Sequence, residues 1–437
     1  MGGSQCDVAV VGGGPAGALA ATYLVQRGYH VVLLDKQTHP RASVGESLIP
    51  DFWKFCDAAG VSRALEDEGF VRKSGGTVGW GDQLYRLSFA EYGYTRPALH
   101  VERDRFDEIL LRHAATQGAE VREGVTVERF EPPQAGESAG LVWRDGEGGR
   151  GRLACRYVLD ASGQMSLIAR QYQLRVTDPS FRFVAIWGYF READYIAADG
   201  SIRKSHEVRE VPPTTFVRSL PFGNGWGWTW HIQLRKQTSV GLIVPLETFR
   251  EINQGPNSVE EFFRSTCLGL PVLGRLLRGA SFVPGSISVM RDYSYRASKL
   301  AGPGYFLIGD AAGFIDPIFS IGVVLGMYGA RIADWAVDRC LRHPARAAEY
   351  QALFAAQLGS RIELSRGLAT PGTRETGERE SDLAPLMGFF EPRAQALMKA
   401  VTTLTGRVGN FEALAAREHR SSPLVCPIHR IADPTCA

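Results

Sequence analysis

Residues 8–17 read VAVVGGGPAG, and this stretch decides the fold. The four apolar residues at its start predict a buried strand. Gly12, Gly14 and Gly17 follow with the spacing G-x-G-x-x-G. Such glycines allow a tight turn, let a pyrophosphate approach the backbone and let a helix pack closely on the strand. The stretch therefore predicts a strand–turn–helix unit that binds a dinucleotide.

The next residues complete a βαβ unit around this turn. Residues 18–27 have the pattern of a helix, and residues 30–34 form a second apolar run that ends at Asp35. The free N–H groups at a helix N-terminus attract phosphate, and an acid after the second strand accepts hydrogen bonds from ribose hydroxyls. We therefore expect Pro15, Ala16 and Lys36 to contact the dinucleotide together with the glycines and Asp35.

Composition sets mild bounds on the rest of the chain. A length of 437 residues predicts two or three structural units. The net charge of +2 gives no reason to expect nucleic acid or an anionic membrane as a partner. Seven scattered cysteines, an odd number, predict no disulfide framework and a cytoplasmic protein. No apolar run reaches the roughly 18 residues of a membrane span, and the N-terminal run does not resemble a signal peptide.

Other segments decide between FAD and NAD. Gly45, Glu46 and Ser47 follow Arg41, and Arg103 precedes an amphipathic stretch at 106–113. The fingerprint of glycines is common to both cofactors, so these additional segments are what favour a flavin. We expect all five residues to contact FAD.

Two further strands end in an acidic turn. An apolar run ends at Asp160 with Gly163 close behind, and a later run ends at Gly309 and Asp310. Two such turns around a long insertion fit a flavin domain built from discontinuous segments. The alternative is ordinary turn chemistry, because Asp and Gly both favour turns.

The stretch 226–232, WGWTWHI, alternates strictly. In a strand, its three tryptophans and Ile232 share one face and bury a large aromatic area. The simplest interpretation is a core strand. Neighbouring β-like runs at 183–190 and 240–245 predict that residues 181–284 form a sheet over the flavin.

These motifs together resemble the flavin-dependent halogenases of the phenol- and pyrrole-modifying branch, within the FAD monooxygenases related to p-hydroxybenzoate hydroxylase. The resemblance covers roughly residues 5–345. It rests on the N-terminal glycines, GESLIP (45–50), Lys73, HVERDRFD (100–107), DASG (160–163), the tryptophan strand, DYSY (292–295) and GDAAGFIDPIFSIGV (309–323).

The resemblance implies an α/β chain, α+β overall. It implies a Rossmann-like FAD-binding domain made of residues 1–180 and 285–345, with a β-sheet substrate domain inserted at 181–284. A helical region of residues 346–437 follows. Within that last region, the polar stretch 370–382 predicts a flexible loop, and Cys426, His429 and Cys436 lack the second ligand pair of a zinc site. No metal is expected.

The resemblance also implies a reaction. Reduced FAD, supplied by a separate flavin reductase, and chloride or bromide would yield hypohalous acid. Lys73 would hold or carry the halogen to an electron-rich ring such as a phenol or pyrrole, free or tethered to an acyl or peptidyl carrier protein, in natural-product or antibiotic biosynthesis. Taken alone, a lysine is expected at the solvated surface; the catalytic role of Lys73 comes from the resemblance.

The segment 309–323 contains the spacing F-x-x-P-x-x-S-x-G, which places Pro317, Gly322 and Val323 beside the flavin ring by resemblance. A helix is expected from about residue 323. A halide needs hydrogen-bond donors and a positive helix end, so the halide site is expected at Ser320, Ile321 and Gly322. The alternative is that Ser320 only caps the helix.

The tryptophan strand departs from the family at one residue. Trp228, Trp230 and Ile232 match the W-x-W-x-I-P element that is thought to keep substrate away from the flavin, but residue 233 is Gln. Proline lacks an N–H, so Gln233 restores a donor at the strand end. A relative that has lost halogenation, or an aromatic hydroxylase that uses FAD and NAD(P)H, therefore stays open. A flavoprotein like geranylgeranyl reductase is a further alternative, because it shares the flavin motifs, but it needs neither Lys73 nor the tryptophan strand.

Overall fold

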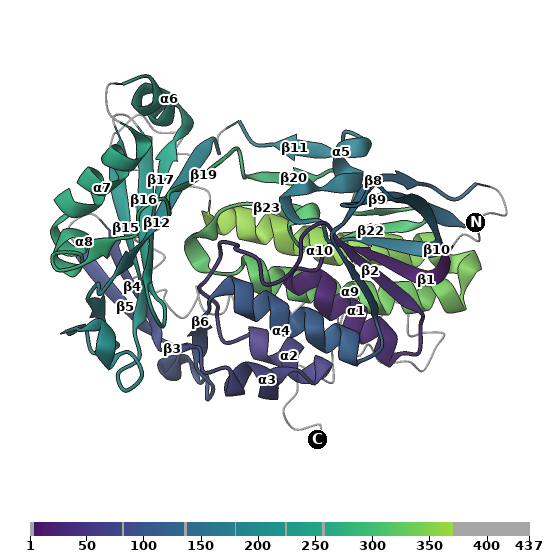
Figure 1. The fold of residues 1–437 in the computed structure, drawn as a ribbon, viewed down its shortest axis with the longest axis horizontal. Helices are drawn as coiled ribbons and strands as arrows, with labels where there is room; N and C mark the ends of the chain where they lie inside the picture. Colours follow the sequence, from purple (N-terminus) through teal and green to yellow (C-terminus); the bar gives the residue numbers. More distant parts are fainter. Residues whose placement is uncertain are drawn as a thin grey trace.

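The computed structural model describes residues 4–80, 83–134, 138–179, 181–222, 225–255 and 258–369 (Figure 1). Two large sheets dominate this part of the chain. The polar stretch 370–382 and the trio Cys426, His429 and Cys436 lie outside the described residues, as does most of the region expected to be helical.

The first sheet grows from the N-terminal strand. Strand β1 (Ser4–Val11) pairs in parallel with β10 (Arg150–Asp160) on one side and with β2 (Val31–Asp35) on the other. The order is β21-β22-β10-β1-β2-β7, with β9 attached antiparallel to β10 and β8 attached antiparallel to β9. The remaining strands are β7 (Glu120–Glu123), β8 (Val125–Glu131), β9 (Ala139–Asp145), β21 (Ala301–Gly302) and β22 (Tyr305–Leu307). The carboxyl ends of the parallel strands therefore meet at one edge.

Four long helices cover this sheet. Helix α1 (Pro15–Gln26) starts three residues before the predicted residue 18, because a proline at the first helical position suits the fixed φ there. The others are α4 (Arg103–Thr116), α9 (Gly322–Arg342) and α10 (Ala347–Ala369). Figure 1 shows α1 and α9 side by side beneath the strands. Short helices α2 (Phe52–Ala59) and α3 (Ser62–Asp67) lie beyond α4.

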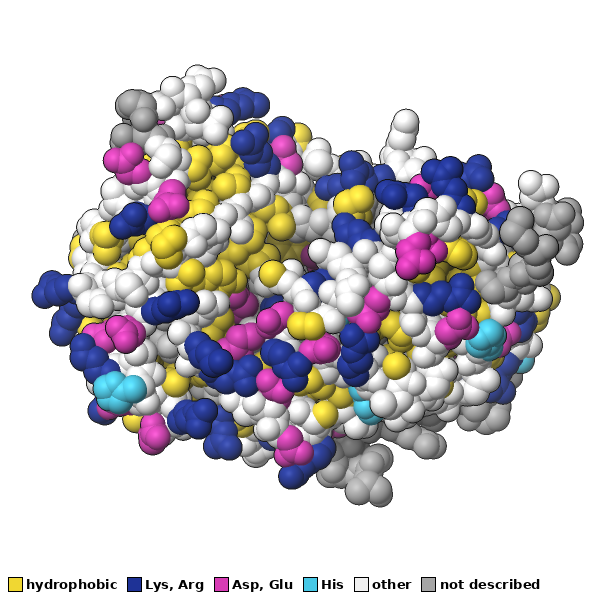
Figure 2. Space-filling view, in the orientation of Figure 1, with side chains coloured by type: hydrophobic (Ala, Val, Ile, Leu, Met, Phe, Trp, Pro, Cys, Tyr) yellow, Lys and Arg dark blue, Asp and Glu magenta, His cyan; other side chains and the backbone are white. Residues whose placement is uncertain are grey.

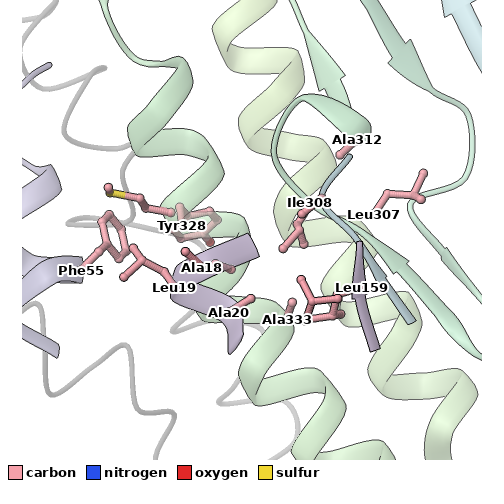
Figure 3. Packing of buried hydrophobic residues seen from close by; sticks show 14 of the residues in the cluster. Ala18, Leu19, Ala20, Phe55, Leu159, Leu307, Ile308, Ala312, Tyr328 and Ala333 are labelled. Carbon is pink, nitrogen blue, oxygen red and sulfur yellow. The ribbon is translucent and has the colours of Figure 1, made fainter. Parts of the chain in front are cut away.

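The core lies between these helices and the sheet. Figure 3 shows Leu159 of β10 and Ile308, which follows β22, near Ala18 and Ala20 of α1 and Ala333 of α9. All five are fully buried. Small residues allow this close approach of two helices to the strands. The prediction of an α/β fold with a Rossmann-like nucleotide domain is confirmed.

The second sheet lies to one side of the first (Figure 1). Its order is β18-β12-β17-β16-β15-β4-β5, with β19 beside β12. The strands are β4 (Gly75–Trp80), β5 (Gln83–Ser88), β12 (Phe183–Arg191), β15 (Thr214–Phe222), β16 (Gly225–Gln233), β17 (Thr238–Pro245), β18 (Ser281–Phe282) and β19 (Ser288–Arg291). The sheet thus extends beyond the expected range 181–284, because β4 pairs in parallel with β15 and β5 pairs with β4.

Strand alternation gives this sheet two different faces. One face packs Ile186, Leu242 and Phe216 against the helices α6 (Leu246–Gln254), α7 (Val259–Gly269) and α8 (Pro271–Leu276). Residues of opposite parity turn toward the first sheet. Because side chains alternate along a strand, the tryptophan face of β16 is directed toward the nucleotide domain.

Small elements connect the two sheets. A two-stranded ribbon, β3 (Val71–Lys73) with β6 (Ala98–His100), carries Lys73. A three-stranded sheet joins β11 (Arg175–Thr177), β20 (Tyr295–Ala297) and β23 (Gly313–Phe314), and β13 (Tyr195–Ile196) pairs with β14 (Ile202–Arg203). No helix of the described residues is long and apolar enough to cross a membrane.

Candidate active site

A cavity of about 1050 Å³ lies between the two sheets. Figure 2 shows the molecular surface hollowed between the two lobes, beside a hydrophobic area on the lobe of the second sheet. The cavity is bounded by the carboxyl ends of β1 and β2, the start of α1, the loop after β2, and the inner face of the second sheet. It has room for a dinucleotide and a ring substrate.

Most of the predicted site residues line this cavity. They are Gly12, Gly14, Pro15, Ala16, Asp35, Lys36, Arg41, Gly45, Glu46, Ser47, Arg103, Gly163, Gly309, Asp310, Pro317, Ser320, Gly322, Val323, Trp228, Trp230 and Ile232. Four predicted residues do not line it, namely Gly17, Lys73, Asp160 and Ile321. The structure therefore brings together segments that are far apart in the sequence.

Asp160, a predicted cofactor contact, does not line the cavity. Its carboxylate is fully buried and accepts hydrogen bonds from the backbone N–H groups of Ser162 (3.0 Å) and Ile168 (2.8 Å). These bonds fix the turn after β10 and the start of the next short helix, α5 (Leu167–Gln171). The Asp160 carboxylate therefore performs the turn chemistry that was the alternative, and its contact with the cofactor stays a prediction.

The nucleotide end of the cavity fits an anionic dinucleotide. Asp35 accepts hydrogen bonds from the N–H groups of Gly13 (2.6 Å) and Gln37 (2.7 Å) at the edge of the cavity. Arg41 lies against Gly14, at the N-terminus of α1, and within the described residues its buried Nε has no hydrogen-bond acceptor. A guanidinium beside a helix N-terminus suits a pyrophosphate, so these residues fit FAD.

Hydrogen bonds from Arg103 fix the loop that carries Glu46. Arg103 forms a bidentate ion pair with Asp107 (2.8 and 3.0 Å), and its Nη1 donates to the carbonyl oxygen of Val44 (2.6 Å). Because most of its donors are used in this way, Arg103 shapes the loop. Glu46 is 2% exposed, and Tyr189 donates to one of its oxygens (2.7 Å).

The second Glu46 oxygen makes no hydrogen bond of good geometry within the described residues. Burial raises the pKa of Glu46 to about 7, although the Ser239 hydroxyl lies close enough to lower the pKa of the carboxyl in part. An orphaned carboxyl oxygen at the wall of the cavity fits a donor on a bound flavin, since buried polar groups are normally hydrogen-bonded. The cofactor's donor groups would satisfy it.

Lys73 is buried, contrary to the expectation for a lysine taken alone. Only 3% of it is exposed, and its Nζ donates to Ser47 Oγ (2.9 Å) and to the Leu48 carbonyl oxygen (3.0 Å). Within the described residues no acidic side chain forms an ion pair with it. Burial lowers the pKa of Lys73 to about 7. The amine lies directly behind Ser47, which is part of the cavity wall.

This burial predicts a stability effect. The folded pKa of Lys73 lies below the ordinary 10.5, so the unfolded chain binds more protons between pH 7 and 10.5 and the free energy of unfolding rises with pH across that window. We expect Lys73→Met to raise that free energy by about 2–4 kcal/mol at neutral pH, with the gain shrinking toward pH 10.5. Urea unfolding at several pH values measures it. A gain that is independent of pH would contradict the burial cost.

The end of the cavity where a halide is expected lies at the start of α9. Ser320 has a left-handed backbone (φ 58°), and Ile321 occupies the N-cap position without a side-chain cap. Ser320 therefore does not cap α9; its hydroxyl donates to Ser47 Oγ (3.0 Å). In the described residues the amides of Ile321 and Gly322 have no hydrogen-bond acceptor, as is usual in a first helical turn. Two N–H groups at a helix start can bind an anion.

The tryptophans form the opposite wall. The Trp230 ring covers Gly241, where an added Cβ would come within 2.2 Å of it, and its Nε1 donates to Ser239 Oγ (3.2 Å). The rings of Trp228 and Trp230 lie 5.6 Å apart. The Gln233 side chain turns away from this wall and accepts a bond from Thr238 Oγ1 (2.7 Å). The Gln233 departure therefore leaves the aromatic wall intact.

Sequence reasoning missed several residues of the cavity wall. They are Val125, Thr126, Val127, Glu128, Arg129, Gln164, Met165, Ala185, Trp187, Thr215, Val217, Met290, Phe314 and Ile318. Tyr293 also lines the wall and donates to Asp316 (3.0 Å), whose pKa burial raises to about 7. The DYSY motif contained the signal for Tyr293. Nothing local in the sequence marks Thr215 or Met290, since each is one residue of an ordinary strand.

The comparisons with known proteins agree with this geometry. The family described as FAD binding domain matches residues 5–268. A flavin-dependent halogenase of Armillaria mellea, armH3, is 31% identical over 352 residues and is aligned over 77% of this chain and 68% of its own length. The chain belongs to the flavin-dependent halogenases.

Other halogenases are also similar to this chain in sequence or structure. The tryptophan 2-halogenase of Chondromyces crocatus is 39% identical over 76% of this chain and 61% of its own length, so the chain spans less than two thirds of that relative. The crystal structure of CmlS, a flavin-dependent halogenase, has a TM-score of 0.76 at 27% identity and covers 90% of this chain and 72% of that one. The myxobacterial chondrochloren halogenase CndH has a TM-score of 0.74 at 26% identity, over 98% of this chain and 97% of its own.

Membership of these halogenases carries FAD binding with it, and the residues at the nucleotide end of the cavity fit that cofactor. No group of three or more potential metal ligands occurs among the residues that the structure describes.

Proposed function

We propose that this protein is a halogenase that uses reduced FAD to chlorinate or brominate an electron-rich aromatic ring. The observation that carries the proposal is the buried amine of Lys73, which has no acidic partner among the described residues and is joined through Ser47 to Ser320 at the start of α9. When bound, the reduced flavin supplies the electrons that let oxygen oxidise halide to hypohalous acid.

Separate groups of residues in this chain would then have separate roles. The amides of Ile321 and Gly322 hold the halide at the positive end of α9. Trp228, Trp230 and Ile232 keep the ring substrate apart from the flavin. Lys73 receives the electrophilic halogen and directs it to the ring. We propose a phenol or pyrrole as the ring, free or tethered to an acyl or peptidyl carrier protein, and a separate flavin reductase as partner.

A single-turnover reaction tests this proposal. The protein is mixed with chemically reduced FAD, chloride or bromide, and oxygen, in the presence of phenols, pyrroles and, in view of the relative named a tryptophan 2-halogenase, indoles. We expect a product that carries the isotope pattern of the halogen in a mass spectrum. Hydroxylated product together with substrate-stimulated NADPH oxidation would instead identify a hydroxylase.

A further inference from the structure

A continuous line of hydrogen bonds runs from the halide end of the cavity into the protein interior. Ser320 Oγ lies 3.0 Å from Ser47 Oγ, and Ser47 Oγ lies 2.8 Å from Thr215 Oγ1. Thr215 Oγ1 lies 2.8 Å from His100 Nε2, and His100 Nδ1 lies 3.0 Å from the carbonyl oxygen of Gln233. These residues come from five separate segments, and all but Ser320 are buried.

The hydrogen bond at the far end of this line fixes which atoms donate and which accept along it. The Gln233 carbonyl oxygen can only accept, so His100 Nδ1 carries the proton. His100 is fully buried, and its pKa lies well below the ordinary value because of burial first and the charge of Lys73 second; its other ionisable neighbour, His231, acts the same way. A neutral imidazole with a proton on Nδ1 has an acceptor at Nε2. The Thr215 hydroxyl therefore donates to His100.

The same donor-to-acceptor order continues along the line as far as Lys73. The Thr215 hydroxyl donates its only proton in the hydrogen bond to His100. Its oxygen therefore accepts a hydrogen bond from the Ser47 hydroxyl. The Ser47 oxygen is then left to accept from Lys73 Nζ and from Ser320. A neutral Lys73 amine has two N–H groups, which the Ser47 oxygen and the Leu48 carbonyl oxygen take up. Its lone pair meets no donor among the described residues.

We propose that His100 and Thr215 are positioning residues that turn the Ser47 hydroxyl away from Lys73, so that the amine keeps its lone pair for the electrophilic halogen. The inference rests on the proposed function of Lys73. The lone pair forms the N–Cl bond of a chloramine with hypochlorous acid, the Cl–O bond breaks, and the departing hydroxide takes one amine proton as water. The Ser320 hydroxyl is committed to Ser47 as well, so the halide is held by backbone amides alone.

Loss of the Thr215 hydroxyl should block the lone pair. In Thr215→Val the Ser47 proton loses its Thr215 acceptor and turns to the Lys73 nitrogen, 2.9 Å away, because the Ser320 hydroxyl donates to Ser47. The probe is formaldehyde with cyanoborohydride, applied to the FAD-loaded chain at a pH about two units above the pKa of Lys73, where the amine is neutral. Peptide mass spectrometry compares methylation at Lys73 with that at exposed Lys299. We expect a drop of about tenfold at Lys73.

A rescue and a matched control separate this role from simple packing. The double variant Ser47→Ala/Thr215→Val lacks the blocking hydroxyl, so Lys73 should regain its rate. Thr214→Val is the control, because it removes a buried hydroxyl from the residue of β15 just before Thr215. That hydroxyl is hydrogen-bonded to Thr77 Oγ1 (2.8 Å) and the Ile196 carbonyl oxygen (3.0 Å), so its loss should leave the methylation rate of Lys73 unchanged. His100→Leu, which frees the Thr215 proton to turn toward Ser47, should match Thr215→Val.

Two results would overturn the inference. One is an unchanged Lys73 rate in both Thr215→Val and His100→Leu; the second variant serves if the first does not fold. The other is a slow rate that Ser47→Ala fails to restore. Because methylation needs no halogenation, a chain that shows the expected pattern but makes no halogenated product would refute only the proposed function.

Discussion

Lys73→Met is expected to lower halogenation by about a thousandfold or more while FAD still binds. The amine lies directly behind Ser47, and methionine fills the buried volume but has no amine that could form a chloramine. The same change removes the cost of burying a charge, so the variant should be at least as stable as the parent at neutral pH. Product formation in single turnover measures the loss, and FAD fluorescence titration confirms that the cofactor site is intact.

Two further variants sharpen this result. Lys73→Arg keeps a positive charge that cannot be lost, so activity in this variant would assign a cationic donor role in place of a nucleophile. Lys299→Met removes an exposed lysine and should leave the rate unchanged. If Lys73→Met retained a tenth or more of the parent's activity, the halogen would be delivered by another group.

Local patterns explain why the nucleotide half was predictable from the sequence. Glycine spacing, apolar runs and helix periodicity act over a few residues, so β1, α1 and β2 were found within a few residues of their ends. The start of α9 at Gly322 was likewise within one residue of the expected 323. Such signals do not depend on what the rest of the chain does.

Long-range packing explains what the sequence did not reveal. The pairing of β4 with β15 joins residues about 140 positions apart, as in the register Gly75↔Thr214, and no local pattern encodes it. Burial decided against a surface position for Lys73, and burial belongs to the folded chain as a whole. The hydrogen-bonded line through Thr215 and His100 is invisible for the same reason, because each residue is ordinary in its own segment.

Gly17→Ala is expected to lower FAD affinity by about a hundredfold or more and to destabilise the fold by about 1–3 kcal/mol. An added Cβ at residue 17 would lie 1.9 Å from the Gly12 carbonyl oxygen and 3.1 Å from the Ala161 Cβ. The contact is with backbone, so α1 must move away from the turn. That movement displaces the helix N-terminus that would face the pyrophosphate. FAD fluorescence titration and urea unfolding measure the two effects separately.

Gly279→Ala is the matched control, because its added Cβ meets nothing within 4 Å and Gly279 has no positive φ. It should leave both quantities unchanged. Gly12→Ala should be worse than Gly17→Ala, since Gly12 combines φ of +104° with a Cβ only 2.3 Å from the Ala161 carbonyl oxygen. Left-handed strain then adds about 1 kcal/mol to the clash. Parent-like FAD affinity in Gly17→Ala would mean that close packing of α1 on the turn does not set the phosphate site.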